Sequence, residues 1–78
     1  MAETAPIRLG SVQRRVLARI VKTNGGGVSQ FDLTPTEKKA MWRLHEMKLV
    51  QGKSGMEHRA VHTREGLELH RRLEEQEQ

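Results

Sequence analysis

Residues 34–63 read TPTEKKAMWRLHEMKLVQGKSGMEHRAVHT, and a helical pattern in their first half gives way to a strand pattern in the second. Thr34, Pro35 and Glu37 form a capping box in which proline occupies the first helical position, where its missing N–H costs nothing. The pattern therefore predicts a helix from Pro35 to Lys48.

The chemistry of this helix depends on its outward face. At about 100° per residue, one face carries Ala40, Met41, Leu44 and Met47. The opposite face carries Lys38, Lys39, Trp42, His45 and Glu46, flanked by Thr36 and Arg43. We therefore expect a basic surface with an aromatic ring in its middle.

The period of the apolar residues changes after Lys48. A short apolar pair precedes the turn-forming Gly-Lys-Ser-Gly sequence at 52–55, and side chains then alternate up to Thr63. These features predict a β-hairpin over residues 49–63. Thr63 is suited to cap a closing helix, whose first turn contains Gly66. Because glycine costs about 1 kcal/mol relative to alanine inside a helix, we expect Gly66 to allow close packing against a strand or the first helix.

An earlier helix is predicted over residues 11–23, with Ser11 as its cap. Its apolar residues recur at helical spacing: Val12, Val16, Leu17, Ile20 and Val21. Asn24 and Gly25 can adopt the left-handed conformation that ends a helix. The segment 28–33 has room for one short turn, with Ser29 as its cap and with Phe31 and Leu33 anchored in the core. We expect residues 1–10 to be a flexible arm, residues 11–74 one domain, and residues 75–78 a frayed acidic tail.

Two stretches resemble winged helix-turn-helix proteins. WRLHEMKLVQ, 42–51, is similar to the end of the recognition helix and the start of the wing in MarR-like and related small bacterial or phage regulators, where an RL..-.GLV pattern is usual. AVHTREGLEL, 60–69, resembles the -.LT..G..L stretch that leaves the wing in the same families. The resemblance covers about residues 34–73 and implies an α+β, mainly helical fold: helix, short helical turn, recognition helix, β-hairpin wing and C-terminal helix.

This sequence departs from the family at two places. The segment GVSQFDL, 27–33, is shorter than the family's usual second helix, and Lys48 stands where a glycine commonly ends the recognition helix.

The resemblance also implies a function, namely transcriptional regulation by binding double-stranded DNA. The helix would enter the major groove and the hairpin would touch the backbone or an adjacent minor groove. The candidate contacts are Thr36, Lys38, Lys39 and Arg43 on the helix and Lys53, His58 and Arg59 on the wing. A homodimer through the closing helix is a further expectation, with Leu67, Leu69 and Leu73 as candidate interface residues.

The charge distribution supports a polyanionic partner. Residues 7–64 contain twelve Lys and Arg against four Asp and Glu, a net charge of +8, whereas residues 65–78 carry −3. Lys and Arg contacts to phosphates supply most of the non-specific affinity for nucleic acids. An ordinary solvated charged surface is the alternative interpretation.

Trp42 leaves three interpretations open. Its indole could fill a gap left by the short second helix, contact a subunit or partner protein, or stack on nucleic acid. A winged-helix protein-interaction module that docks a partner, such as a polymerase or a larger assembly, through Trp42 and the closing helix is therefore the alternative function. RNA is a further possible ligand.

Other classes of protein lack support in the sequence. The chain has no cysteine, and on a strand His58 and His62 would lie about 13 Å apart, too far to share one metal ion. The sequence contains no recognisable catalytic constellation, so we expect a non-enzyme without cofactor or metal. Without a bilayer-spanning apolar run or a leader pattern, the expected location is the cytoplasm, with no membrane partner.

Overall fold

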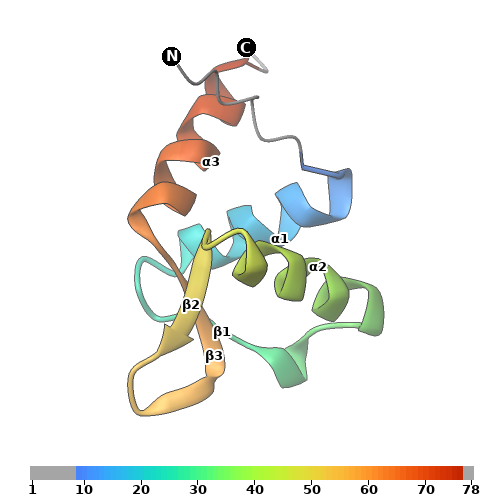
Figure 1. Ribbon diagram of the computed structural model, residues 1–78, viewed down its shortest axis with the longest axis vertical. Helices are drawn as coiled ribbons and strands as arrows, with labels where there is room; N and C mark the ends of the chain where they lie inside the picture. The colour runs from blue at the N-terminus through green and yellow to red at the C-terminus, as the bar shows by residue number, and fades with distance from the viewer. Residues whose placement is uncertain (1–8, 77–78) are drawn as a thin grey trace.

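The computed structural model describes residues 9–76 as a small α+β fold of helices and an antiparallel sheet (Figure 1). The elements along the chain are α1 (Ser11–Lys22), β1 (Val28–Ser29), the 3₁₀ turn η1 (Gln30–Asp32), α2 (Pro35–Glu46), β2 (Val50–Lys53), β3 (Met56–His62) and α3 (Arg64–Gln76). Helices α1 and α2 lie in the middle, α3 extends from one end and the β2–β3 hairpin from the other (Figure 1).

The sheet has the order β1-β3-β2, and both pairs of strands are antiparallel. The hairpin predicted over residues 49–63 is therefore confirmed. Strand β1 was not predicted, because two residues are too few to show an alternating pattern. The register shifts along the hairpin: Gly52 lies opposite Ala60, but Lys53 lies opposite Met56. Residues 57–59 therefore form a bulge in β3.

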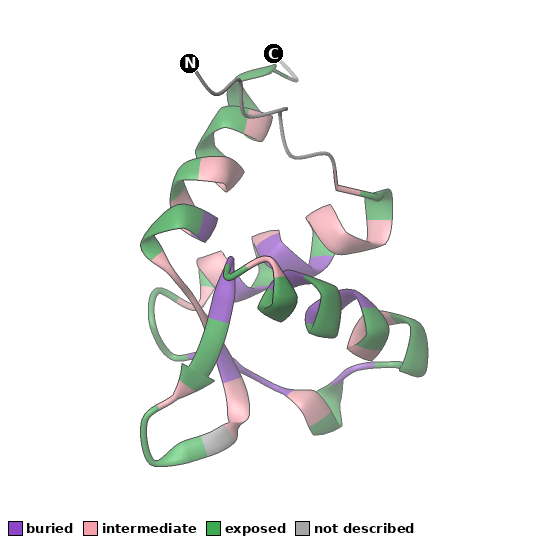
Figure 2. Ribbon diagram, in the orientation of Figure 1, coloured by how far each residue is buried: buried purple, intermediate pink, exposed green. Residues whose placement is uncertain are grey.

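The hydrophobic core lies between the helices and the sheet (Figure 2). Helix α1 buries Val16, Leu17 and Ile20, and α2 buries the face predicted for it. The full set of buried apolar residues is Val16, Leu17, Ile20, Val28, Leu33, Ala40, Met41, Leu44, Leu49, Val50 and Ala60.

The segment between α1 and α2 corrects one prediction. Ser29 does cap the short turn, since its Oγ accepts the Phe31 N–H at 3.2 Å. Leu33 is buried as expected, but the Phe31 side chain is 72% exposed, so its placement in the core was wrong. Phe31 lies within the 3₁₀ turn, whereas Leu33 follows it with an extended backbone (φ −106°, ψ 145°), so the two side chains need not face the same way.

The N-terminus of α2 has the predicted capping box. The Thr34 N–H donates to Glu37 Oε1 at 2.9 Å, and the Thr34 hydroxyl accepts the Glu37 N–H at 3.2 Å.

The C-terminus of α2 lies at Glu46 rather than at Lys48. The Lys48 and Leu49 N–H groups donate to the carbonyls of His45 and Leu44, at 3.0 and 2.9 Å, which is the pattern of a Schellman motif. Lys48 has a φ of 63° in this motif. It therefore takes the left-handed conformation for which glycine is commonly used at this position in the family that the sequence resembles.

Ser11 was predicted to be the N-cap of α1, but it is the first residue of the helix. Gly10 is the N-cap, and its N–H donates to Gln13 Oε1 at 3.1 Å. The predicted end is confirmed, because Asn24 and Gly25 have φ values of 53° and 96°.

Helix α3 starts with the Thr63 cap, which accepts the Gly66 N–H at 3.1 Å. The helix continues to Gln76, two residues beyond the predicted end of the domain. The rest of the predicted tail, residues 77–78, and residues 1–8 of the predicted arm lie outside the described residues. No helix within residues 9–76 is long and apolar enough to cross a lipid bilayer.

Candidate nucleic-acid interface

The outward surface of α2 divides into two flanks. On the first, Thr36, Lys39 and Arg43 are exposed and border a groove against the start of α1, residues 10–13. Spacings of three and four residues place these side chains in one row along the helix. The structure thus brings three of the four predicted helix contacts together beside α1.

The second flank of α2 faces η1 and the hairpin. Lys38, Trp42 and His45 follow one another at spacings of four and three residues, so they form a second row. The Trp42 side chain is 60% exposed. The fourth predicted helix contact, Lys38, therefore lies with the tryptophan rather than with Lys39.

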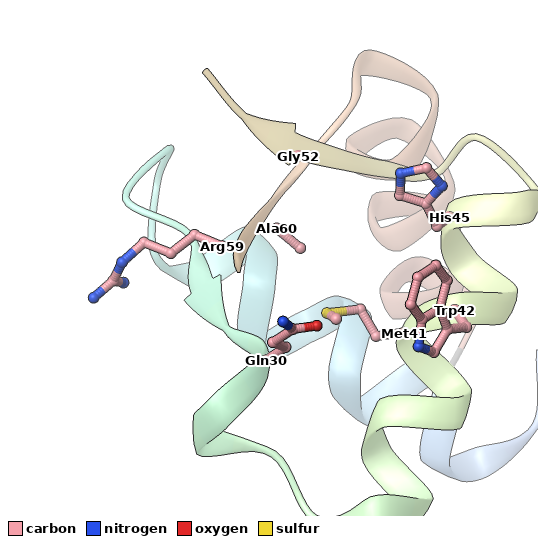
Figure 3. A pocket seen from close by; sticks show the side chains of 7 residues that line it. All are labelled: Gln30, Met41, Trp42, His45, Gly52, Arg59 and Ala60. Atoms are coloured by element: carbon pink, nitrogen blue, oxygen red, sulfur yellow. The ribbon is translucent and has the colours of Figure 1, made fainter. Parts of the chain in front are cut away.

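A hollow of about 100 Å³ adjoins the second row. Met41 and Gln30 point toward each other across its floor, whereas Trp42 and His45 stand along its α2 side (Figure 3). The residues that line it are Gln30, Met41, Trp42, His45, Gly52, Arg59 and Ala60. The hollow lies beside the short η1 turn, and the Trp42 indole stands at its rim and does not fill it.

One acidic residue shares the outward surface of α2. Glu46 Oε1 lies 3.5 Å from Arg43 Nη1, and both side chains are more than 60% exposed. Exposed ion pairs of this kind contribute about 0–1 kcal/mol. Arg43 can therefore exchange this carboxylate for a phosphate at little cost.

Glu37, the other acidic residue of α2, is engaged at the cap. The hydrogen bond from the Thr34 N–H holds the pKa of the Glu37 carboxyl below its ordinary value, and the positive charges of Arg19 and Arg15 add to this effect. These two arginines belong to α1. The basic side of α1 therefore lies near the start of α2.

Two cations of the hairpin contact the glycine-rich turn after α1. Lys53 Nζ donates to the Gly26 carbonyl at 3.4 Å, and Arg59 Nη1 donates to the Gly27 carbonyl at 3.2 Å. The Arg59 side chain consequently points away from the hollow (Figure 3). Lys53 and Arg59, which were predicted as wing contacts for DNA, thus also hold this turn in place, a role that was not predicted.

His58, the third predicted wing contact, stacks on Phe31. The two ring centroids are 5.7 Å apart and the planes differ by 27°. His58 lies within the β3 bulge, and bulges redirect side chains locally. Phe31, His45 and Gln30 were missed as site residues, although the spacing of Trp42 and His45 on one helix was a signal for one of them.

The candidate interface residues of α3 lie apart from Trp42. Leu69 packs against the core, and Leu67 and Leu73 are half-buried. Leu73 borders a hollow between α1 and α3 that shares no residue with the one beside Trp42. Trp42 and Leu73 therefore border two separate hollows.

Comparison with known proteins adds no assignment. No protein-family model matches the chain, and neither the curated proteins nor the solved structures contain a match. Among the described residues, no three His, Asp or Glu side chains are grouped as a metal site would require.

Proposed function

We propose that this chain is a small winged-helix protein that binds double-stranded DNA and regulates transcription without acting as an enzyme. The observation that carries the proposal is the outward surface of α2. One face of this helix is buried, and the other presents Lys38, Lys39 and Arg43 next to a projecting hairpin. The order of helix, short turn, capped helix, hairpin and helix supports the winged-helix assignment.

Helix α2 is the element that we place in the major groove, which is about 12 Å wide and admits an α-helix. Lys39, Arg43 and Thr36 would contact one strand from the α1 side, and Lys38 would contact DNA from the hairpin side. The hairpin would reach the backbone with Lys53, His58 and Arg59. Lys53 can do so by releasing its exposed 3.4 Å hydrogen bond.

Fluorescence anisotropy on a mixed-sequence duplex at several salt concentrations tests the proposal. Affinity should fall as salt rises, because each neutralised phosphate adds about 0.9 to the slope of log K against log salt. The double variant Lys38→Glu/Lys39→Glu should weaken binding by at least about 10-fold and lower the slope by about 1 for each phosphate that is no longer neutralised.

The matched control is Arg71→Glu/Arg72→Glu, which reverses two exposed charges on α3. It changes the net charge by the same amount but leaves α2 intact. Equally weakened binding by the two double variants would mean that only net charge matters and that α2 is not the contact element. Absence of binding to the duplex at low salt would refute the proposal outright.

A homodimer is part of the proposal. It is supported by Leu73, which borders the hollow between α1 and the distal half of α3. A second copy packed there would cover this side chain. Sedimentation at micromolar concentration should then show a species larger than the 8.9 kDa chain, and a monomer alone would contradict the dimer.

The exposure of Trp42 favours a second candidate function, a protein-interaction module. A large exposed indole commonly marks a contact surface. In that case the Lys38→Glu/Lys39→Glu variant would keep its function, and Trp42→Ala would lose it.

A further inference from the structure

Two aromatic rings, those of Trp42 and His45, line the α2 side of the hollow between α2 and the hairpin. On the α2 side, the centroids of Trp42 and His45 are 6.3 Å apart. Phe31 and the His58 ring that stacks on it are not among the residues that line the hollow. The exposed indole of Trp42 thus borders a hollow of about 100 Å³ that no side chain of residues 9–76 fills.

The solvent exposure of these rings is costly unless they bind something. Among residues 9–76 the exposed large apolar side chains are Phe31 at 72%, Trp42 at 60% and Met56 at 40%. Neither ring contributes to the core, so stability does not account for them. Trp42 also borders the hollow, and this placement indicates a binding role for its indole.

The charges near the rings indicate the chemistry of the ligand. Lys38 lies one turn before Trp42 in the same row, and His45, about one turn after Trp42, adds a polar imidazole to the lining. An apolar surface on a partner protein would make few favourable contacts with these polar and charged side chains. Aromatic faces beside cations are instead the combination that holds nucleobases and their phosphates, and stacking of this kind tolerates any base.

We propose that the hollow receives a nucleobase that has left the double helix, stacked on Trp42 and followed by phosphates beside Lys38. The inference rests on the proposed function and extends it: the protein prefers duplexes that contain an unpaired base. A mismatched or bulged base is the cheapest to extrude, because less stacking and pairing must be given up.

The test compares a perfectly paired duplex with the same duplex containing one bulged adenine. The chain has one tryptophan and no tyrosine, so its fluorescence reports on Trp42. We expect the bulged duplex to quench this emission and to bind between about 5-fold and about 100-fold more tightly, which corresponds to the usual strength of base–aromatic stacking. The paired duplex should bind without comparable quenching.

Variants separate stacking from general apolar contact. Trp42→Leu should abolish the preference for the bulged duplex, whereas Trp42→Phe should retain most of it. Met56→Ala is the matched control, because it also removes an exposed apolar side chain, but one that lies on the hairpin and not on α2. It should leave the preference intact.

Several results would overturn the inference. Equal affinity for the two duplexes with normal salt dependence would refute the base site and leave the proposed function standing. A preference that survives Trp42→Leu would also refute it. Emission that changes with protein concentration in the absence of DNA would assign the surface to a second copy of the chain, and binding to neither DNA would refute the proposed function as well.

Discussion

Replacing Gly66 by alanine should destabilise the protein, although the same change stabilises an ordinary helix. A Cβ built on Gly66 lies 2.0 Å from the Leu49 carbonyl oxygen and 3.0 Å from its carbon. Both atoms are backbone, so no side-chain rotation relieves the clash. Gly66 is also helical and not left-handed, which means that space, and not conformational freedom, requires glycine here.

The free-energy cost of Gly66→Ala depends on which parts of the backbone must shift to make room for the Cβ. Relief requires a shift of more than about 1 Å between α3 and the chain before β2, and overpacking of this kind costs about 1–3 kcal/mol. The shift would also strain two hydrogen bonds, from the Thr63 N–H to the Leu49 carbonyl at 3.0 Å and from the Thr63 hydroxyl to the Lys48 carbonyl at 2.7 Å. Each contributes about 1 kcal/mol. The helix propensity of alanine is about 1 kcal/mol more favourable than that of glycine. Subtracting this gain from the costs of overpacking and of the two strained hydrogen bonds leaves a net destabilisation of about 2–4 kcal/mol.

Thermal unfolding followed by circular dichroism measures this destabilisation. For a domain of this size, 1 kcal/mol corresponds to about 4–8 °C in Tm, so Gly66→Ala should lower Tm by at least about 8 °C. Gly10→Ala is the control, because nothing lies within 4 Å of a Cβ at Gly10, and its effect should stay within about 1 kcal/mol. A Gly66→Ala protein as stable as the original, or more stable, would refute the close packing.

Two further predictions concern the ends of α2. The pKa of Glu37 is lowered from 4.5 in the folded state, so the stabilisation by its carboxylate is complete above the unfolded pKa and is lost as pH falls through the folded one. Glu37→Gln should flatten the dependence of Tm on pH in the acid range, and an unchanged acid profile would contradict this role. Lys48→Gly should raise the free energy of unfolding by about 0.5–1 kcal/mol, because glycine takes the φ of 63° without steric cost. A lower denaturation midpoint in urea would count against that reasoning.

The helices and the hairpin could be predicted because their signals are local. The capping box at Thr34, the glycine-containing turn at 52–55 and the apolar spacing in α1 each depend on residues only a few positions apart. Strand β1 could not be predicted, because its two residues become a strand only by pairing with residues 59–60, about thirty positions away.

The candidate site was less predictable for the same reason. The outward orientation of Trp42 followed from helical periodicity, but the hollow beside it depends on how η1, α2 and the hairpin pack. Phe31 was wrongly assigned to the core because an apolar residue in a short loop gives no periodicity from which to judge its direction. The hydrogen bonds of Lys53 and Arg59 to the glycine turn likewise join segments distant in the sequence.

The close packing at Gly66 also bears on the proposed interface. The carbonyls of Lys48 and Leu49, which join α2 to the hairpin, both accept hydrogen bonds from Thr63, and Gly66 packs directly against Leu49. The angle between α2 and the hairpin is therefore fixed by the junction of β3 with α3. Since we propose that α2 and the hairpin contact DNA together, a change at Gly66 should weaken binding even though no residue of that junction touches the ligand. The stretch that closes the fold thus also sets the geometry of the surface that we propose for DNA.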